Sequence, residues 1–358
     1  MKGPRLVLKP SLPKAILDNQ PITALAPMQD VTTLAFMRVV AQYGSPDYFF
    51  TEYFRVHDHS RLEPHILSSI TENPSGRPVF AQLIGDNPNE LKLAAQELSH
   101  YPIAGVDLNL GCPAPKVYKK NAGGGLLRDL NYLDNLLGVL RSAIPGLFTV
   151  KMRVGFDSAD SFDGLLALIA KHKVDLLSLH GRTVKDMYRA PVRYPLIAQA
   201  VQELPCPVLA NGNITSAAHA LEVQKSTLAH GVMIGRAAIR NPWIFRQCRE
   251  LWSAKPIFRP TLGDAHGYIK KLYDATWVEG IPENSHLSRL KKFLNFIGLS
   301  VDPQGAFLHQ MRRCQTFPEL WNVCEVFLLK EPQTLFSDEP HEGLVARPNC
   351  EVSKDSCA

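Results

Sequence analysis

The stretch that decides the fold is residues 149–183, TVKMRVGFDSADSFDGLLALIAKHKVDLLSLHGRT. Short β-branched and apolar runs at its two ends predict strands at Thr149–Arg153 and Leu176–His180. The helical pattern between them predicts a helix at Phe162–His172. A strand, a helix and a second strand in this order are typical of a parallel sheet. The stretch therefore predicts a parallel α/β fold.

The same alternation extends in both directions over about 230 residues. Further strands are predicted at Ile22–Ala26, Tyr48–Thr51, Val79–Leu83, Val106–Asn109, Val208–Asn211 and Val232–Ile234. Further helices are predicted at Leu34–Tyr43, Pro88–Ser99, Leu130–Ala143, Tyr194–Glu203 and Ala217–Ser226. Eight strands alternating with helices predict a closed (β/α)₈ barrel of the TIM type. A doubly wound open sheet is the alternative, which is disfavoured because no G-x-G-x-x-G follows the first strand.

The pattern changes after the predicted eighth strand. Residues 261–330 have helical periodicity without strand signals, and Leu287, Leu290 and Leu294 mark one apolar face. From Glu331 onward apolar residues are sparse, so a disordered tail is expected. We predict an N-terminal extension at 1–20, a barrel at 21–250, a small helical domain at 251–330 and an acidic tail at 331–358.

Composition excludes several classes of protein. Apolar runs are too short to span a membrane, and the N-terminus lacks the apolar stretch of a signal peptide, so a cytoplasmic location is expected. Seven cysteines without a C-x-x-C pair argue against a disulfide framework or a zinc site, and no metal is predicted. Six acids and two bases follow Lys330, which leaves +9 for residues 1–330 in a chain of overall charge +5. A basic body suits a polyanionic partner.

The segment Asp107-Leu-Asn-Leu-Gly-Cys-Pro-Ala-Pro115 places a cysteine directly after a predicted strand. Glycine and proline on either side hold the backbone in a fixed turn. Cys112 would then lie at the barrel mouth, where it could act as a nucleophile or an acid. The alternative is a small apolar residue in a tight turn. The glycine run Asn121–Gly125 lacks the ending of a P-loop and is expected to form a mobile loop beside the cysteine.

Polar groups end nearly every predicted strand, which is where barrel enzymes build their sites. The turns Ala210–Asn213 and Met233–Arg236 follow the seventh and eighth strands, the usual barrel site for a phosphate. Arg236 would add a charge-assisted contact. Lys151 lies in an apolar strand and needs an anionic partner, which a reduced flavin would supply. Ordinary glycine turns and a lysine reaching solvent are the alternatives.

Taken together, these residues resemble the tRNA-dihydrouridine synthase family over about residues 22–330. The matching segments occur in the family's order and are Leu25–Met28, Ala81–Leu83, Leu108–Pro113, Gly123–Gly125, Val150–Arg153, His180–Thr183, Ala210–Asn213 and Ile234–Arg236. Each segment alone is a weak signal, but the set is highly specific. The resemblance implies an FMN-binding barrel followed by a helical domain, the organisation that the sequence pattern predicts.

The resemblance also implies a chemistry. NADPH or NADH would reduce FMN, the flavin would deliver hydride to C6 of uracil, and Cys112 would protonate C5. The residues implied to hold FMN are Pro27, Met28, Gln29, Gln82, Lys151, His180, Asn211, Gly212, Asn213, Gly235 and Arg236. The implied partner is tRNA, and neither a membrane nor a stable protein partner is expected.

Further segments resemble the synthase C subgroup, which modifies uridine 16 in the D-loop. They are Thr51–Val56, Ser288–Leu294 and the pair Tyr188-Arg189. The implied RNA contacts are Arg55, Asn109, Arg153, Tyr188, Arg289 and Lys291. Three features depart from the family: Asn213 stands where an acid is common, Ala237 replaces a usual glycine, and the acidic tail is unfamiliar.

Two other functions compete with this hypothesis. An FMN barrel reductase acting on a free pyrimidine would share the phosphate loops and the catalytic cysteine. It would not explain the basic cluster Arg289, Lys291, Lys292, Arg312 and Arg313. A non-catalytic RNA-binding barrel is the second alternative, and the presence of Cys112, Lys151 and His180 argues against it.

Overall fold

The structure is a computed structural model, and it describes Leu12 and residues 20–337. The chain divides into two compact units, neither of which is continuous in sequence. The first contains Met1–Leu34, Pro46–Asn213 and Glu222–Met233. The second contains Ala35–Ser45, Ile214–Leu221 and Ile234–Ala358.

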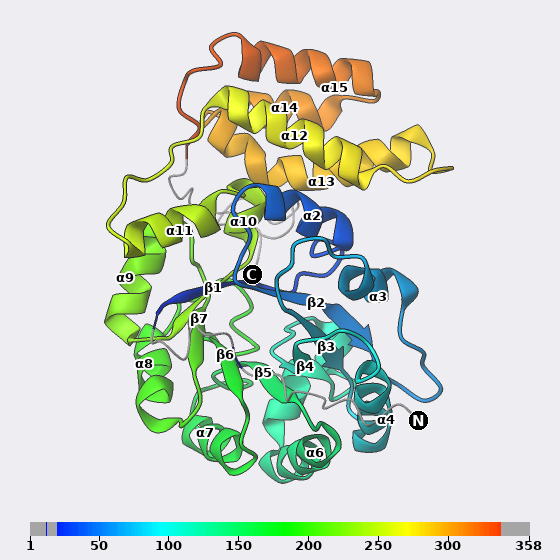
Figure 1. The fold of residues 1–358 in the computed structure, drawn as a ribbon, viewed down its shortest axis with the longest axis vertical. Coiled ribbons are helices and arrows are strands. Elements are labelled where there is room, and N and C mark those ends of the chain that lie inside the picture. The colour runs from blue at the N-terminus through cyan, green and yellow to red at the C-terminus, as the bar shows by residue number, and fades with distance from the viewer. Residues whose placement is uncertain (1–11, 13–19, 338–358) are drawn as a thin grey trace, which may run out of the picture. The chain divides into compact units, whose positions relative to one another are not determined.

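The first unit is built on a closed barrel of eight parallel strands that are neighbours in chain order (Figure 1). The prediction of a (β/α)₈ barrel is confirmed. The Ile22 amide donates to the His230 carbonyl at 3.1 Å, where the last strand meets the first. The strands are β1 (Ile22–Leu25), β2 (Tyr48–Arg55), β3 (Val79–Ile84), β4 (Gly105–Leu110), β5 (Leu147–Arg153), β6 (Leu176–His180), β7 (Val208–Asn211) and β8 (Gly231–Ile234). The second strand runs four residues beyond its predicted end at Thr51.

Helices alternate with these strands as predicted, and their ends follow local capping chemistry. The Asn87 side chain accepts from the Asn89 and Glu90 amides at the start of α4, and Asp129 accepts from Tyr132 at the start of α6. The helices up to β8 are α2 (Leu34–Gln42), α3 (Pro64–Thr71), α4 (Pro88–Leu98), α5 (Pro115–Tyr118), η1 (Gly123–Arg128), α6 (Leu130–Ala143), α7 (Phe162–Lys171), α8 (Tyr194–Glu203) and α9 (Ala217–Thr227). Sequence patterns did not predict α3, α5 or η1.

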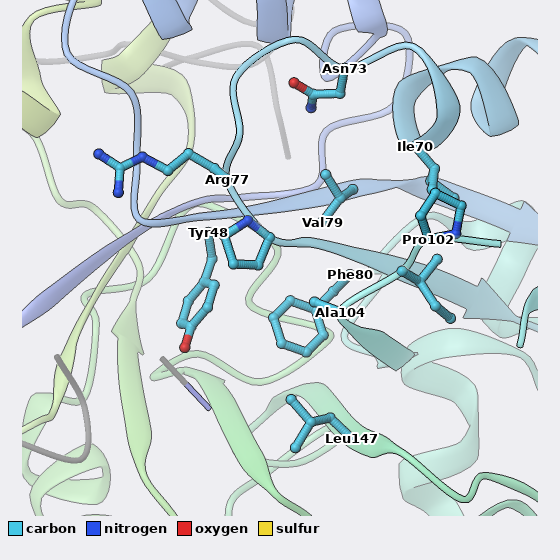
Figure 2. A pocket seen from close by; sticks show the side chains of 11 residues that line it. Tyr48, Ile70, Asn73, Arg77, Val79, Phe80, Pro102, Ala104 and Leu147 are labelled. Atoms are coloured by element: carbon cyan, nitrogen blue, oxygen red, sulfur yellow. The ribbon is translucent and has the colours of Figure 1, made fainter. Parts of the chain in front are cut away.

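The barrel interior is apolar at its base. One cluster of buried residues joins Tyr48, Phe80, Leu147 and others near the starts of the strands, and Leu12 packs against it. A cavity of about 390 Å³ lies at this end, lined by Tyr48, Val79 and Leu147, which begin β2, β3 and β5 (Figure 2). Active sites of such barrels lie at the opposite ends of the strands. This cavity is therefore not the candidate site.

The second unit is helical. Its main helices are α10 (Arg236–Arg240), α11 (Ile244–Trp252), α12 (Leu262–Thr276), α13 (Glu283–Val301), α14 (Ala306–Arg313) and α15 (Phe317–Cys324), followed by the π-helix η2 (Glu325–Leu329). The predicted apolar face of α13 is confirmed, because Leu287, Leu290 and Leu294 are all buried. Phe293 on the same helix stacks on Phe36 with ring centroids 5.5 Å apart. None of the described helices is long and apolar enough to cross a membrane.

The start of the acidic tail differs from its predicted disorder. Leu335 forms an isolated bridge with Thr261, and Phe336 is buried in the second unit. Backbone hydrogen bonds also hold this segment, since the Leu262 amide donates to the Thr334 carbonyl and the Phe336 amide donates to the Pro260 carbonyl. Residues 338–358, like 1–11 and 13–19, lie outside the described part of the chain.

Barrel closure predicts a sensitive glycine. A Cβ at Gly231 in β8 would collide with the Ile22 carbonyl oxygen of β1. We expect Gly231→Ala to destabilise the protein by about 1–3 kcal/mol, the usual range for overpacking. Urea unfolding measures this change. Gly267→Ala in α12 is the matched control, because its Cβ meets nothing within 4 Å and should be neutral or stabilising. Equal midpoints for the two variants would contradict the prediction.

Candidate active site

Cys112 follows β4 in a turn held by the last polar residue of that strand. The Asn109 Oδ1 accepts from the backbone amides of Gly111 at 3.0 Å and Cys112 at 2.9 Å. The cysteine is partly buried, and α5 begins three residues later at Pro115. Cys112 therefore lies at the C-terminal end of a barrel strand, as predicted, and two hydrogen bonds to the Asn109 side chain hold its backbone.

The glycine run beside Cys112 is a buried 3₁₀-helix, η1, and not the mobile loop expected from sequence. Gly124 donates its amide to the Cys112 carbonyl at 3.3 Å. Gly123 has a φ of +56°, and a Cβ there would lie 3.0 Å from the Cys112 Cβ. Glycine is needed because the segment packs directly against the cysteine, and not because it moves.

A chain of hydrogen bonds leads from the barrel interior to the Cys112 turn. Thr149 Oγ1 and Gln82 Nε2 both donate to the Asp107 carboxylate, each at 2.6 Å. Asn109 Nδ2 donates to Gln82 Oε1 at 2.8 Å. Strand register explains the contacts, because Gln82 pairs with Asp107, and Asp107 with Thr149, across neighbouring strands. Neither Asp107 nor Thr149 was predicted as a site residue.

Lys151 is paired in register with Asn109 and is partly buried. Within the described residues its ammonium donates no hydrogen bond, unlike the neighbouring Arg153. Burial, with a smaller contribution from the nearby Arg153, lowers the pKa of Lys151 to about 8, although Asp107 and Cys112 act in the opposite direction. A partly desolvated cation without a hydrogen-bonded partner favours an anion beside it.

Arg153 is almost fully buried and joins the loops that follow β4 and β6. Its Nε donates to the Gly111 carbonyl at 3.0 Å, and its Nη1 donates to Thr183 and Met187 carbonyls, both at 2.7 Å. Its guanidinium also lies 5.5 Å from the ring centroid of Tyr188, which is itself exposed. The RNA contact predicted for Arg153 thus falls on a buried residue that fastens the Cys112 turn to the loop after β6.

His180 and Gly212 occupy neighbouring strand ends. His180 pairs with Asn211 in register, and Asn211 Nδ2 donates to the Met233 carbonyl at 2.8 Å. Gly212 has a φ of +116°, and a Cβ there would lie 3.0 Å from the His180 ring. Asn213, with a φ of 48°, accepts from Arg182 at 3.3 Å. Asparagine tolerates this left-handed conformation well.

The remaining predicted residues lie in several places. Pro27 and Met28 follow β1 and are partly buried, whereas Gln29 is exposed. The Met28 amide donates to Thr32 Oγ1 at 2.9 Å. Arg55 is exposed at the end of β2. Gly235 and Arg236 lie in the second unit, at the start of α10. Arg289 and Lys291 lie on α13. Their roles stay predictions.

The Cys112 thiol is a poor thiolate. Burial raises its pKa above the ordinary value of 9.0, and the Ala114 backbone, Arg153, Lys151 and Lys116 offset this only in part. The thiol therefore keeps its proton at neutral pH. A protonated side chain suits an acid better than a nucleophile, which must be ionised to attack.

Comparison with known proteins agrees with this geometry. The family profile described as dihydrouridine synthase (Dus) matches residues 24–311. The chain belongs to the dihydrouridine synthase family. A tRNA-dihydrouridine(16) synthase of Haemophilus ducreyi is 34% identical over 317 residues, 83% of this chain and 92% of that protein. A probable tRNA-dihydrouridine synthase of Helicobacter pylori is 37% identical over 228 residues, 63% of this chain and 69% of that protein.

If Cys112 acts as an acid, its thiol should ionise only at a pH above the ordinary range. We expect iodoacetamide to alkylate Cys112 at a rate that still rises above pH 9, because burial raises its pKa. Mass spectrometry of the Cys112 peptide between pH 7 and 10 measures the rate. The same peptide in denatured protein is the control and should titrate near about 8.5. A native midpoint at or below the denatured one would contradict the prediction.

Proposed function

We propose that this dihydrouridine synthase reduces uridine to 5,6-dihydrouridine in the D-loop of tRNA, at position 16, with FMN as cofactor and NADPH or NADH as reductant. The observation that carries the proposal is the position of Cys112 directly after β4, in a turn whose backbone amides Asn109 holds, with the partly buried Lys151 paired in register with Asn109. The likeness to the Haemophilus ducreyi protein, whose name specifies position 16, supports the target nucleotide.

The residues at the strand ends suit FMN. Lys151 offers a cation that is not hydrogen-bonded within the described residues, and Gln82 and Asn109 each keep one amide N–H beyond the bond that they donate. Gly212 leaves room beside His180 that a Cβ would fill. Such donors suit the carbonyl oxygens and the anionic groups of a flavin. When bound, FMN would supply the hydride for C6 of the uracil.

Cys112 would supply the proton for C5. Burial keeps the proton on sulfur until a substrate carbon accepts it, and Arg153 and Lys151 oppose the negative charge that then remains. The two bonds from Asn109 hold the backbone, so the thiol would approach the base from one direction. General acid catalysis of this kind contributes about 10²- to 10⁴-fold in rate.

The RNA must be held away from the reacting base. A uracil stacked inside folded tRNA has to be turned out, which costs a few kcal/mol. Helices α13 and α14 carry exposed Arg289, Lys292, Arg312 and Arg313. Lys291 lies among them, and its Nζ donates to the Arg312 carbonyl at 3.0 Å and the Cys314 carbonyl at 2.5 Å. We propose that this basic surface binds phosphates, with Lys291 ordering the end of α14.

The proposed acid predicts a separable defect. We expect Cys112→Ala to purify yellow with flavin and to oxidise NAD(P)H, yet to form dihydrouridine about 10²- to 10⁴-fold more slowly. Visible absorbance, NAD(P)H oxidation and mass spectrometry of tRNA nucleosides measure the three steps. Cys206→Ala is the control, since this buried thiol lies before β7, at the opposite end of the strand from the site. Normal turnover by Cys112→Ala would remove this residue from the mechanism.

The basic surface predicts a salt effect. We expect Arg289→Ala to weaken tRNA binding and to flatten the slope of log affinity against log salt by about 0.7–0.9. Flavin content should not change. Lys291→Ala should mainly lower the thermal midpoint, because two carbonyls at the end of α14 lose their donor. Unchanged slope and affinity for Arg289→Ala would favour an enzyme of free pyrimidines.

A further inference from the structure

Asp107 is fully buried in the barrel, one layer below the Cys112 turn, and the chemistry proposed for this enzyme leaves it without a task. It pairs in register with Gln82 on one side and Thr149 on the other. Its carboxylate accepts one hydrogen bond from each of them. A buried acid in a protein core is costly unless it has such partners, and one of them, Gln82, continues through Asn109 toward the Cys112 turn.

The hydrogen bonds between Asp107 and Cys112 all run in one direction. Gln82 donates to Asp107, Asn109 donates to Gln82, and the Gly111 and Cys112 amides donate to Asn109. A primary amide can turn over and exchange its donor and acceptor ends. The two ends of this chain cannot do so, because a backbone N–H only donates and an ionised carboxylate only accepts.

The geometry points to Asp107 as a positioning residue that fixes the amide orientation of Gln82 and Asn109 and thereby holds the Cys112 turn. With Asp107 in place, the Gln82 oxygen faces Asn109 and the Asn109 oxygen faces the Cys112 amide. Each side chain retains one N–H beyond the bond that it donates. Without an acceptor at position 107, Gln82 can turn over and present an N–H to Asn109. Asn109 would then lose either its hydrogen bond with Gln82 or the hydrogen bond that it accepts from the Cys112 amide.

Three substitutions separate this role from simple support of the fold. Asp107→Leu keeps the branching at Cγ and removes the acceptor. Asp107→Asn removes the charge but keeps an oxygen for Gln82, because the Thr149 hydroxyl can accept the new N–H in place of donating. Thr149→Val removes the other bond to Asp107 and leaves the chain to Cys112 intact. Asp107→Ala replaces the leucine variant if that protein does not fold.

The experiment measures two properties of each folded variant, namely the alkylation rate of Cys112 at fixed pH and the kcat and KM for tRNA. We expect Asp107→Leu to lower kcat by about 10- to 100-fold with little change in KM, since a small misplacement of a reacting group has this effect. Its Cys112 alkylation rate should also differ from that of the wild type. Asp107→Asn and Thr149→Val should both stay within about threefold of the wild-type kcat.

The outcomes distinguish this inference from the proposed function on which its kinetic arm rests. If the wild type forms no dihydrouridine, the function fails, and the alkylation rates still test Asp107. An unchanged alkylation rate and kcat in folded Asp107→Leu would overturn the inference. A defect in Thr149→Val as large as that in Asp107→Leu would also overturn it. So would equal defects in Asp107→Asn and Asp107→Leu, which would assign the effect to the charge that faces Lys151.

Discussion

The in-register pairing of β4 with β5 is the constraint on which the rest of the site depends. It places Asp107 beside Thr149 and Asn109 beside Lys151. Because side chains alternate along a strand, Asp107, Asn109, Thr149 and Lys151 all face the barrel interior, in successive layers. A shift of one residue in either strand would turn its polar groups outward. Barrel closure protects against that shift, since no strand has a free edge along which it could slide.

Two opposing effects set the electrostatics of the site. Burial alone would discharge both partners, since it raises the pKa of Cys112 and lowers that of Lys151. Their mutual attraction acts against burial, and Asp107 supports the charge on Lys151 as well. Burial is the larger effect for the thiol, so the resting site holds a neutral acid beside a cation. That arrangement is ready to release a proton and to tolerate the charge left behind.

Sequence predicted the barrel because strand length and alternation are local signals. Every predicted strand was found, and the polar residues Gln82, Asn109 and His180 lie near the strand ends where they were predicted. The glycine run was misjudged because glycine permits motion and close packing equally, and only residues distant in sequence that pack against it, such as Ile84 and Val184, decide between them. The burial of Arg153 could not be predicted, for a similar reason. Its burial depends on carbonyls about 30 to 42 residues away in the chain, which no local pattern reveals.

Arg153 and Asp107 both act on the position of the Cys112 turn, Arg153 directly and Asp107 through Gln82 and Asn109. Asn109 Oδ1 accepts from the two backbone amides of the Cys112 turn, and Arg153 donates to the Gly111 carbonyl of the same turn. A turn fixed at both its donors and its acceptors loses little further freedom when substrate binds, so less binding energy is needed to order it. Flexible loops would serve capture of a large RNA better, but they would hold a proton donor poorly. In the proposed function, the two requirements fall on different parts of the chain, the proton donor on the barrel and the basic surface on helices of the second unit.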